Sequence, residues 1–158
     1  MKVLVIYDTV FGNTEQVAKA IGEALGANEE VTTLQVNTIK VEQLREFEVL
    51  IVGSPTRSFM PTKDITAFLD KIPRDGLKSV KVAAFDTRVE IGEVKSRLLK
   101  AVAGVFGYAA KPILDGLVRV GGVPMAPPEG FIVRGREGPL RDGELGRAAA
   151  WEKMLIKK

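Results

Sequence analysis

Short runs of apolar and β-branched residues alternate with longer helical stretches, and this alternation constrains the fold more than any other feature of the chain. Five such runs are expected to be strands, namely Lys2–Tyr7, Val31–Val36, Val49–Gly53, Val80–Phe85 and Glu129–Val133. The alternation is typical of βαβ units, in which helices connect parallel strands. Right-handed crossovers then place helices on both faces of the sheet. The sequence therefore predicts an α/β fold with a doubly wound, five-stranded parallel sheet.

The stretches between these runs have the periodicity of amphipathic helices. In Asn13–Ala27, for example, apolar side chains recur every fourth residue at Val17, Ile21 and Leu25. Further helices are expected at Pro61–Lys71, Gly92–Val105, Tyr108–Val120 and Asp142–Lys157. Because no repeat, low-complexity tract or linker interrupts the pattern, residues 1–158 are expected to form a single domain.

The composition excludes several kinds of active site. The 158 residues include no His and no Cys, so a Ser-His-Asp or Cys-His nucleophile, a structural zinc site and a dithiol redox centre cannot be built. The sequence predicts neither a catalytic side chain nor a metal site. If the protein carries out redox chemistry, a bound cofactor must carry the electrons.

Charge and hydropathy argue against a nucleic-acid interface and against a membrane span. The 23 basic residues nearly balance the 20 acidic ones, which indicates a mixed, solvated surface and no nucleic-acid interface. The longest apolar run, Val3–Tyr7, is too short for a membrane span or a signal-peptide core. We therefore expect no membrane span and a cytoplasmic location.

Strand order predicts where a ligand binds. In the order 2-1-3-4-5, the winding reverses between the first and third strands, and ligands of such sheets bind beyond the carboxyl ends of the strands at that point. The loops that follow Tyr7, Gly53 and Phe85 should therefore converge at one edge of the sheet.

The first of these loops, residues 8–14, has the features of a phosphate-binding loop. The start of a helix leaves backbone N–H groups unpaired and carries partial positive charge, so a phosphate is stabilised there. Thr9 and Thr14 add hydroxyl donors, and Gly12 allows close approach of the backbone. Because the loop has no Lys or Arg, neutral donors would hold a monophosphate. The alternative is an ordinary turn with an Asn or Thr helix cap.

Competing nucleotide motifs are absent. The dinucleotide motif G-x-G-x-x-G cannot occur because no two glycines stand two positions apart, and Gly12 is not followed by the Lys of a Walker loop. A phosphoryl-receiver domain would have an Asp at the end of the third strand, where this chain has Gly53-Ser54.

The second and third loops carry groups suited to a planar, hydroxylated ligand. The second, Gly53–Pro61, is stiffened by two prolines and supplies Ser and Thr hydroxyls. The third, Phe85–Arg88, offers backbone amides and an acidic acceptor. Three polar loops at the predicted switch point favour a binding site over three ordinary turns.

The residues of these loops, taken together, resemble the flavodoxin family over nearly the whole chain. Val5–Thr14 is similar to the family's phosphate loop, Gly53–Thr56 to its second flavin loop, and Ala84–Arg88 to the third loop of some members. The resemblance implies a flavodoxin-like fold, FMN as the cofactor and electron transfer as the activity. The cofactor-binding residues that it implies are Thr9, Val10, Phe11, Gly12, Asn13 and Thr14 in the first loop, Ser54, Pro55, Thr56, Arg57, Ser58 and Phe59 in the second, and Asp86, Thr87 and Arg88 in the third.

The chain departs from the family at the aromatic residues that stack on the flavin. Arg57 stands where the first aromatic residue is often found, and no Tyr follows in the third loop; Phe59, Phe106 and Tyr108 are the candidates for replacement. A guanidinium at position 57 beside the flavin would favour the anionic reduced form and raise its reduction potential. The alternative is an Arg57 side chain that points into solvent.

The sequence leaves three functions open. The first is an FMN-binding carrier that passes electrons between redox partner proteins. The second is an FMN-dependent reductase that uses NAD(P)H and a quinone or nitro compound, for which the absent aromatic residues would leave space above the ring. The third is a flavin module that docks on a larger oxidoreductase. Trp151 is interpreted as a residue for packing or for contact with a partner, and the arginines at 134, 136, 141 and 147 are interpreted as solvated surface.

Overall fold

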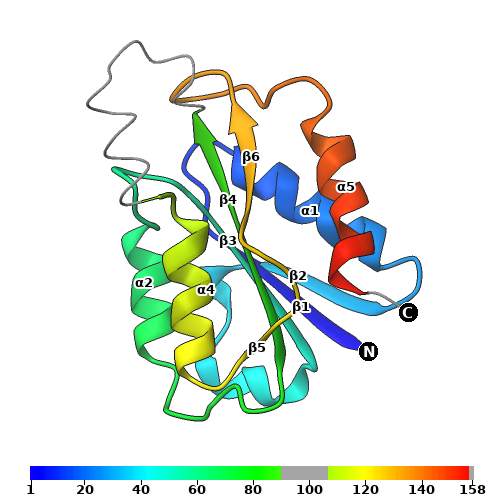
Figure 1. The fold of residues 1–158 in the computed structure, drawn as a ribbon, viewed down its shortest axis with the longest axis vertical. Coiled ribbons are helices and arrows are strands. Elements are labelled where there is room, and N and C mark those ends of the chain that lie inside the picture. Colours follow the sequence, from blue (N-terminus) through cyan, green and yellow to red (C-terminus); the bar gives the residue numbers. More distant parts are fainter. Residues whose placement is uncertain (90–106, 157–158) are drawn as a thin grey trace.

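The computed structural model describes residues 1–89 and 107–156, which form one twisted sheet with helices on both faces (Figure 1). The strand order is β2-β1-β3-β4-β5, with β6 also paired to β4, and every pairing is parallel. The predicted architecture and strand order are confirmed. The helix expected at Gly92–Val105 lies outside the described residues.

The strands follow the apolar runs of the sequence. Their bounds are β1 Lys2–Tyr7, β2 Glu30–Gln35, β3 Val49–Pro55, β4 Lys81–Val89, β5 Val123–Pro124 and β6 Glu129–Val133. The central strands are covered on both faces and are almost continuously apolar, as is typical of a buried parallel sheet. In β1, for instance, every residue from Val3 to Tyr7 is buried.

The helices lie in two layers. Helices α1 (Asn13–Leu25) and α5 (Glu144–Leu155) cover one face of the sheet, and α2 (Lys63–Asp70) and α4 (Ala110–Arg119) cover the other (Figure 1). Two short 3-10 helices, Val36–Thr38 and Val41–Glu46, connect β2 to β3. Alternation along the strands separates two cores. In β4, Val82 and Ala84 face the α2–α4 layer, whereas Ala83 and Phe85 face the α1–α5 layer.

Two strands differ from the prediction. Strand β4 continues to Val89, so Asp86, Thr87 and Arg88 are strand residues and do not form a loop; Asp86 and Thr87 pair with both β3 and β6, and Arg88 pairs with β6. The position of the fifth strand is shared by two segments, since β5 pairs with the start of β4 and β6 with its end. The polar side chains of residues 86–88 are atypical of a buried strand, so the sequence does not predict the extension of β4. The prolines of residues 124–128 likewise do not indicate a strand at β5.

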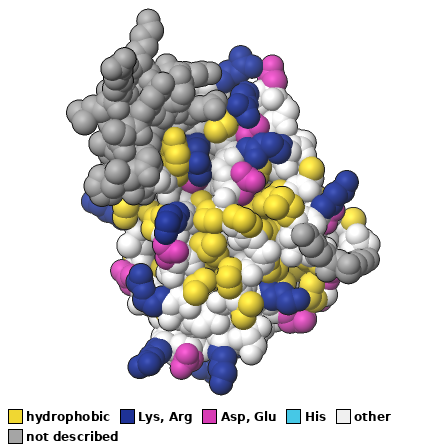
Figure 2. Space-filling view, in the orientation of Figure 1, with side chains coloured by type: hydrophobic (Ala, Val, Ile, Leu, Met, Phe, Trp, Pro, Cys, Tyr) yellow, Lys and Arg dark blue, Asp and Glu magenta, His cyan; other side chains and the backbone are white. Residues whose placement is uncertain are grey.

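Trp151 has the packing role that its helical spacing predicts. It is 4% exposed, and its ring packs edge-on against Phe85 at 6.3 Å and against Phe131 at 6.1 Å. Figure 2 shows hydrophobic side chains gathered on this face of the molecule. Val123 of β5 and Met154 of α5, which border one surface pocket, are about half exposed. Within residues 1–89 and 107–156, no helix has the length and apolar character that crossing a membrane requires.

Candidate functional site

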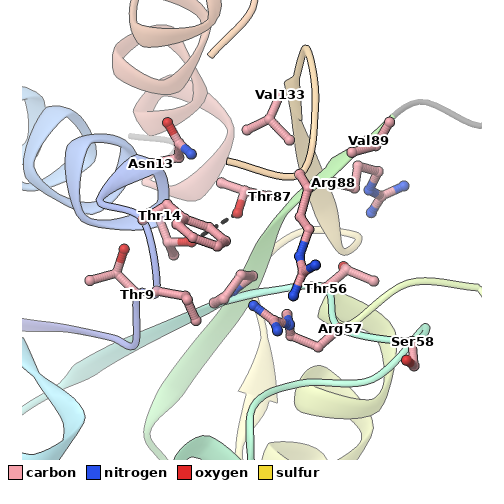
Figure 3. Close-up of a pocket in the computed structure, with 14 residues that line it drawn as sticks. Thr9, Asn13, Thr14, Thr56, Arg57, Ser58, Thr87, Arg88, Val89 and Val133 are labelled. Atoms are coloured by element: carbon pink, nitrogen blue, oxygen red, sulfur yellow. Dashed lines mark hydrogen bonds between the residues drawn. The ribbon is translucent and has the colours of Figure 1, made fainter. Parts of the chain in front are cut away.

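A pocket of about 320 Å³ lies at the carboxyl edge of the sheet, beyond β1, β3 and β4. Figure 3 shows residues from all three of the predicted loops around it. The lining residues are Thr9, Val10, Phe11, Asn13, Thr14, Pro55, Thr56, Arg57, Ser58, Thr87, Arg88, Val89, Val133 and Arg136. The structure thus brings together segments that are far apart in the sequence, at the predicted switch in winding order.

The first loop is held in shape by its own polar side chains. The Asp8 carboxylate accepts a hydrogen bond from the Thr9 amide at 2.9 Å and another from the Thr62 hydroxyl at 2.6 Å. The Thr9 hydroxyl accepts from the Gly12 amide at 2.9 Å. Gly12 has φ of +93°, a conformation that glycine adopts at little cost, and helix α1 begins at the next residue. Asp8 therefore acts as a turn residue that fixes the shape of the first loop.

The start of α1 is suited to an anion. Among the described residues, no side chain caps its first turn, so the amides of that turn remain available to a ligand. The hydroxyls of Thr14 and Thr87 lie 2.8 Å apart and share a hydrogen bond, which connects α1 to β4 (Figure 3). Thr14 is 1% exposed, and it lines the pocket.

The second loop is a tight turn that is fixed by a buried serine. Ser54 is fully buried, and its hydroxyl accepts from the Thr62 amide at 3.0 Å. Arg57 and Met60 exchange two backbone hydrogen bonds of 2.8 and 2.9 Å across Ser58 and Phe59. Both central residues have positive φ, 49° and 67°, which is uncommon without glycine and fixes the turn at a local cost in free energy.

A buried ion pair lies at the end of β4. Asp86 is 0% exposed and accepts two hydrogen bonds of 2.7 Å from the Arg88 guanidinium, together with one of 2.9 Å from the Ala110 amide. Burial raises the pKa of Asp86, an effect that the hydrogen bonds from Arg88 offset only in part. The Arg88 guanidinium also lies 3.7 Å from the centroid of the Tyr108 ring. Arg88 is therefore a fixed cation whose charge is compensated by Asp86.

A fourth segment, residues 134–140, completes the pocket wall, and it lies outside the three loops that the sequence predicts. Its anchor is the Asn13 side chain, which donates a hydrogen bond to the Glu137 carbonyl at 3.1 Å. Gly138 packs so closely that a Cβ there would lie 2.7 Å from the Asn13 amide group. Arg136 in this segment and Val133 just before it line the pocket. The glycines at 135 and 138 were the available signal for a close approach.

Glu144 is a buried acceptor for residues on both sides of this segment in the sequence. It is 2% exposed, and it accepts hydrogen bonds from the Ile132 amide and from Arg147 at 2.7 Å each and from Arg141 at 3.2 Å. Burial would raise the pKa of Glu144, but these hydrogen bonds and charges outweigh it and lower the pKa to about 2. Arg134 pairs with Asp142 at 3.0 Å. Three of the four arginines interpreted as solvated surface are thus paired with carboxylates.

Most of the predicted site residues line the pocket, with four exceptions. Ser54 and Asp86 are buried behind the wall, Gly12 provides the turn before α1, and Phe59 is not among the lining residues. Phe106 lies outside the described residues, and Tyr108 packs on Arg88. Phe11 is the aromatic residue that lines the pocket within residues 1–89 and 107–156, and it is 42% exposed.

Comparison with known proteins gives a consistent result. The family model described as "Flavodoxin domain" matches residues 4–97. A flavodoxin from Picosynechococcus sp. is 40% identical over 55 residues, which cover 35% of this chain and 32% of that protein. A flavodoxin from Clostridium saccharobutylicum is 32% identical over 89 residues, covering 55% of this chain and 56% of that protein. The chain therefore spans about half or less of the length of these relatives.

Solved structures extend the similarity in fold over the whole chain. A flavodoxin from the domain Archaea aligns with a TM-score of 0.74 at 23% identity, covering 96% of this chain and 94% of that one. Flavodoxin 1 from Bacillus cereus aligns with a TM-score of 0.77 at 16% identity, covering 99% and 98%. Because the family model matches more than half of the 158 residues, the chain belongs to the flavodoxin domain family.

Proposed function

We propose that this protein binds FMN in the pocket at the carboxyl edge of the sheet and carries electrons between redox partner proteins. The observation that carries the proposal is the convergence of uncapped amides, hydroxyls and arginines on one pocket at the start of α1. The lining residues include no Asp or Glu, so nothing in the described wall repels an anionic ligand.

The chemistry of the wall fits the parts of FMN. The first loop, with the amides of α1 and the hydroxyls of Thr9 and Thr14, would hold the phosphate. Thr56 and Ser58 would serve the ribityl chain, while Phe11 offers an apolar surface to the ring. Bound FMN would supply reversible one- and two-electron transfer. The protein would orient the flavin and set the charge around it.

A titration with FMN tests this proposal. Purified protein is expected to be yellow, with absorbance at about 450 nm, if it retains the flavin. If it is purified without flavin, it is expected to bind added FMN and to quench the fluorescence of the flavin as this moves from water into a protein site. A stable one-electron-reduced flavin without NAD(P)H oxidation would support a carrier. Steady NAD(P)H oxidation with a quinone would instead identify a reductase. If the protein binds no FMN at any concentration, both the carrier and the reductase are refuted.

Replacing Arg57 with alanine is expected to lower the potential for full reduction of bound FMN. Arg57 lines the pocket, and its positive charge would favour the anionic reduced flavin. Because the side chain is exposed, the expected shift is small, roughly a few tens of millivolts. Redox titration of both proteins measures it, and an unchanged or higher potential would show that Arg57 does not act on the flavin.

A further inference from the structure

Residues 134–140, the fourth segment of the pocket wall, contribute one arginine to the lining, Arg136. We propose that Arg136 binds the phosphate of FMN and supplies the counter-charge that the first loop lacks, so that the pocket prefers the phosphorylated flavin to riboflavin. This inference rests on the proposed function and assigns the recognition of the phosphate to a fourth segment of the chain.

The position of Arg136 is set by contacts on both sides of it. The next residue, Glu137, accepts the hydrogen bond from Asn13, which is the first residue of α1. In Figure 3, Asn13, Thr87 and Val133 lie along one side of the pocket, whereas Arg57 and Ser58 lie along the opposite side. Arg136 lines the same pocket within a single residue of a direct contact with α1. Arg136 therefore lies one residue from a contact with the start of α1, where the phosphate is expected.

The ion pairs of this region distinguish Arg136 from its neighbours. Arg134 pairs with Asp142 at 3.0 Å, Arg141 with Glu144 at 3.2 Å, and Arg88 with Asp86 at 2.7 Å. Within residues 1–89 and 107–156, the Arg136 guanidinium has no carboxylate partner, although Glu137 is adjacent in sequence. An exposed arginine that lines a pocket without an internal counter-ion is available to an anionic ligand.

The charge of Arg136 can balance a negative charge on the phosphate that the start of α1 balances only in part. A phosphate monoester carries about −1.5 to −2 charges near pH 7, whereas the start of a helix supplies roughly half a positive charge. The loop residues 8–14 contain no cation, and Asp8 adds a negative charge. A guanidinium matches two phosphate oxygens with parallel N–H donors, and such charge-assisted bonds are about twice as strong as neutral ones. Arg136 would therefore balance the ligand.

A binding comparison between two flavins tests the inference, because riboflavin is FMN without its phosphate. With apoprotein and fluorescence quenching as the readout, R136Q is expected to weaken FMN binding roughly tenfold and to leave riboflavin binding unchanged. R136K keeps the positive charge but loses the paired N–H donors of the guanidinium, so its affinity for FMN should lie between those of wild type and R136Q. R134Q is the matched control, because its arginine lies in the same segment but is paired with Asp142.

Salt provides a second readout. Between about 0.1 M and about 1 M NaCl the Debye length falls from about 10 Å to about 3 Å, so FMN affinity should fall more steeply in wild type than in R136Q. If R136Q binds FMN as tightly as wild type, or loses both flavins equally, Arg136 does not recognise the phosphate. A wild-type protein that binds neither flavin would refute the proposed function itself.

Discussion

Replacing Gly53 with alanine is expected to lower the free energy of unfolding by about 2–3 kcal/mol. A Cβ at this position would lie 2.0 Å from the Phe85 ring, which is far inside contact distance. The ring cannot move away easily, because it is fully buried and packs edge-on against Phe131 and Trp151. Gly53 also pairs with Tyr7 and Phe85 in the centre of the sheet, so its backbone cannot move independently.

Urea unfolding measures this effect as a lower midpoint at an unchanged slope. Gly146→Ala is the matched control, since Gly146 lies in α5 and, among the described residues beyond its own turn of helix, no atom lies within 4 Å of the position that a Cβ would take there. That substitution should raise the stability by up to about 1 kcal/mol, through helix propensity alone. A G53A protein as stable as wild type would show that the aromatic cluster can rearrange at little cost.

Acidification is expected to remove a large part of the stability through Glu144. Its pKa is lowered to about 2 in the folded protein, below the ordinary value of 4.5. The folded state therefore binds this proton less tightly than the unfolded state, and the stabilisation is present above the unfolded pKa and is lost as the pH falls towards 2. The shift corresponds to about 3 kcal/mol at neutral pH.

Urea unfolding of wild type and E144Q between about pH 7 and about pH 2.5 measures the contribution of Glu144 as a difference. E144Q should be less stable at neutral pH, and the gap should narrow below about pH 5. Asp86, whose raised pKa acts in the opposite direction, is present in both proteins and cancels. A gap that stays constant with pH would show that the carboxylate charge of Glu144 is not what stabilises the fold.

The sequence predicts the architecture because apolar periodicity decides which faces are buried. The uninterrupted run in β1 and the fourfold spacing of Val17, Ile21 and Leu25 in α1 describe the two sides of one interface. The extension of β4 was not predictable, because the burial of Asp86 and Thr87 depends on hydrogen bonds to residues outside the strand as well as to Arg88. Arg88 and the Ala110 amide satisfy Asp86, and Thr14 satisfies Thr87.

The candidate site shows the same limit. The first two loops are recognisable by composition, since hydroxyl, glycine and proline residues cluster immediately after apolar strands. The glycines and the proline of residues 134–140 indicate a tight turn, but the place of this segment in the pocket wall depends on contacts such as the hydrogen bond between Asn13 and Glu137, which are more than a hundred residues apart. Contacts of that range leave no periodic signal in the sequence.

Thr14 and Thr87, the two threonines that line the pocket side by side, can reverse the direction of the hydrogen bond that they share. Thr14 and Thr87 share one hydrogen bond of 2.8 Å in which either oxygen can be the donor. Two hydroxyl hydrogens serve that single bond, so one hydrogen is always left over, and it can sit at either end. An acceptor that arrives at one end fixes the direction of the pair and thereby the hydrogen position on the opposite element, so the beginning of a helix and the end of a strand respond together without any movement of the backbone.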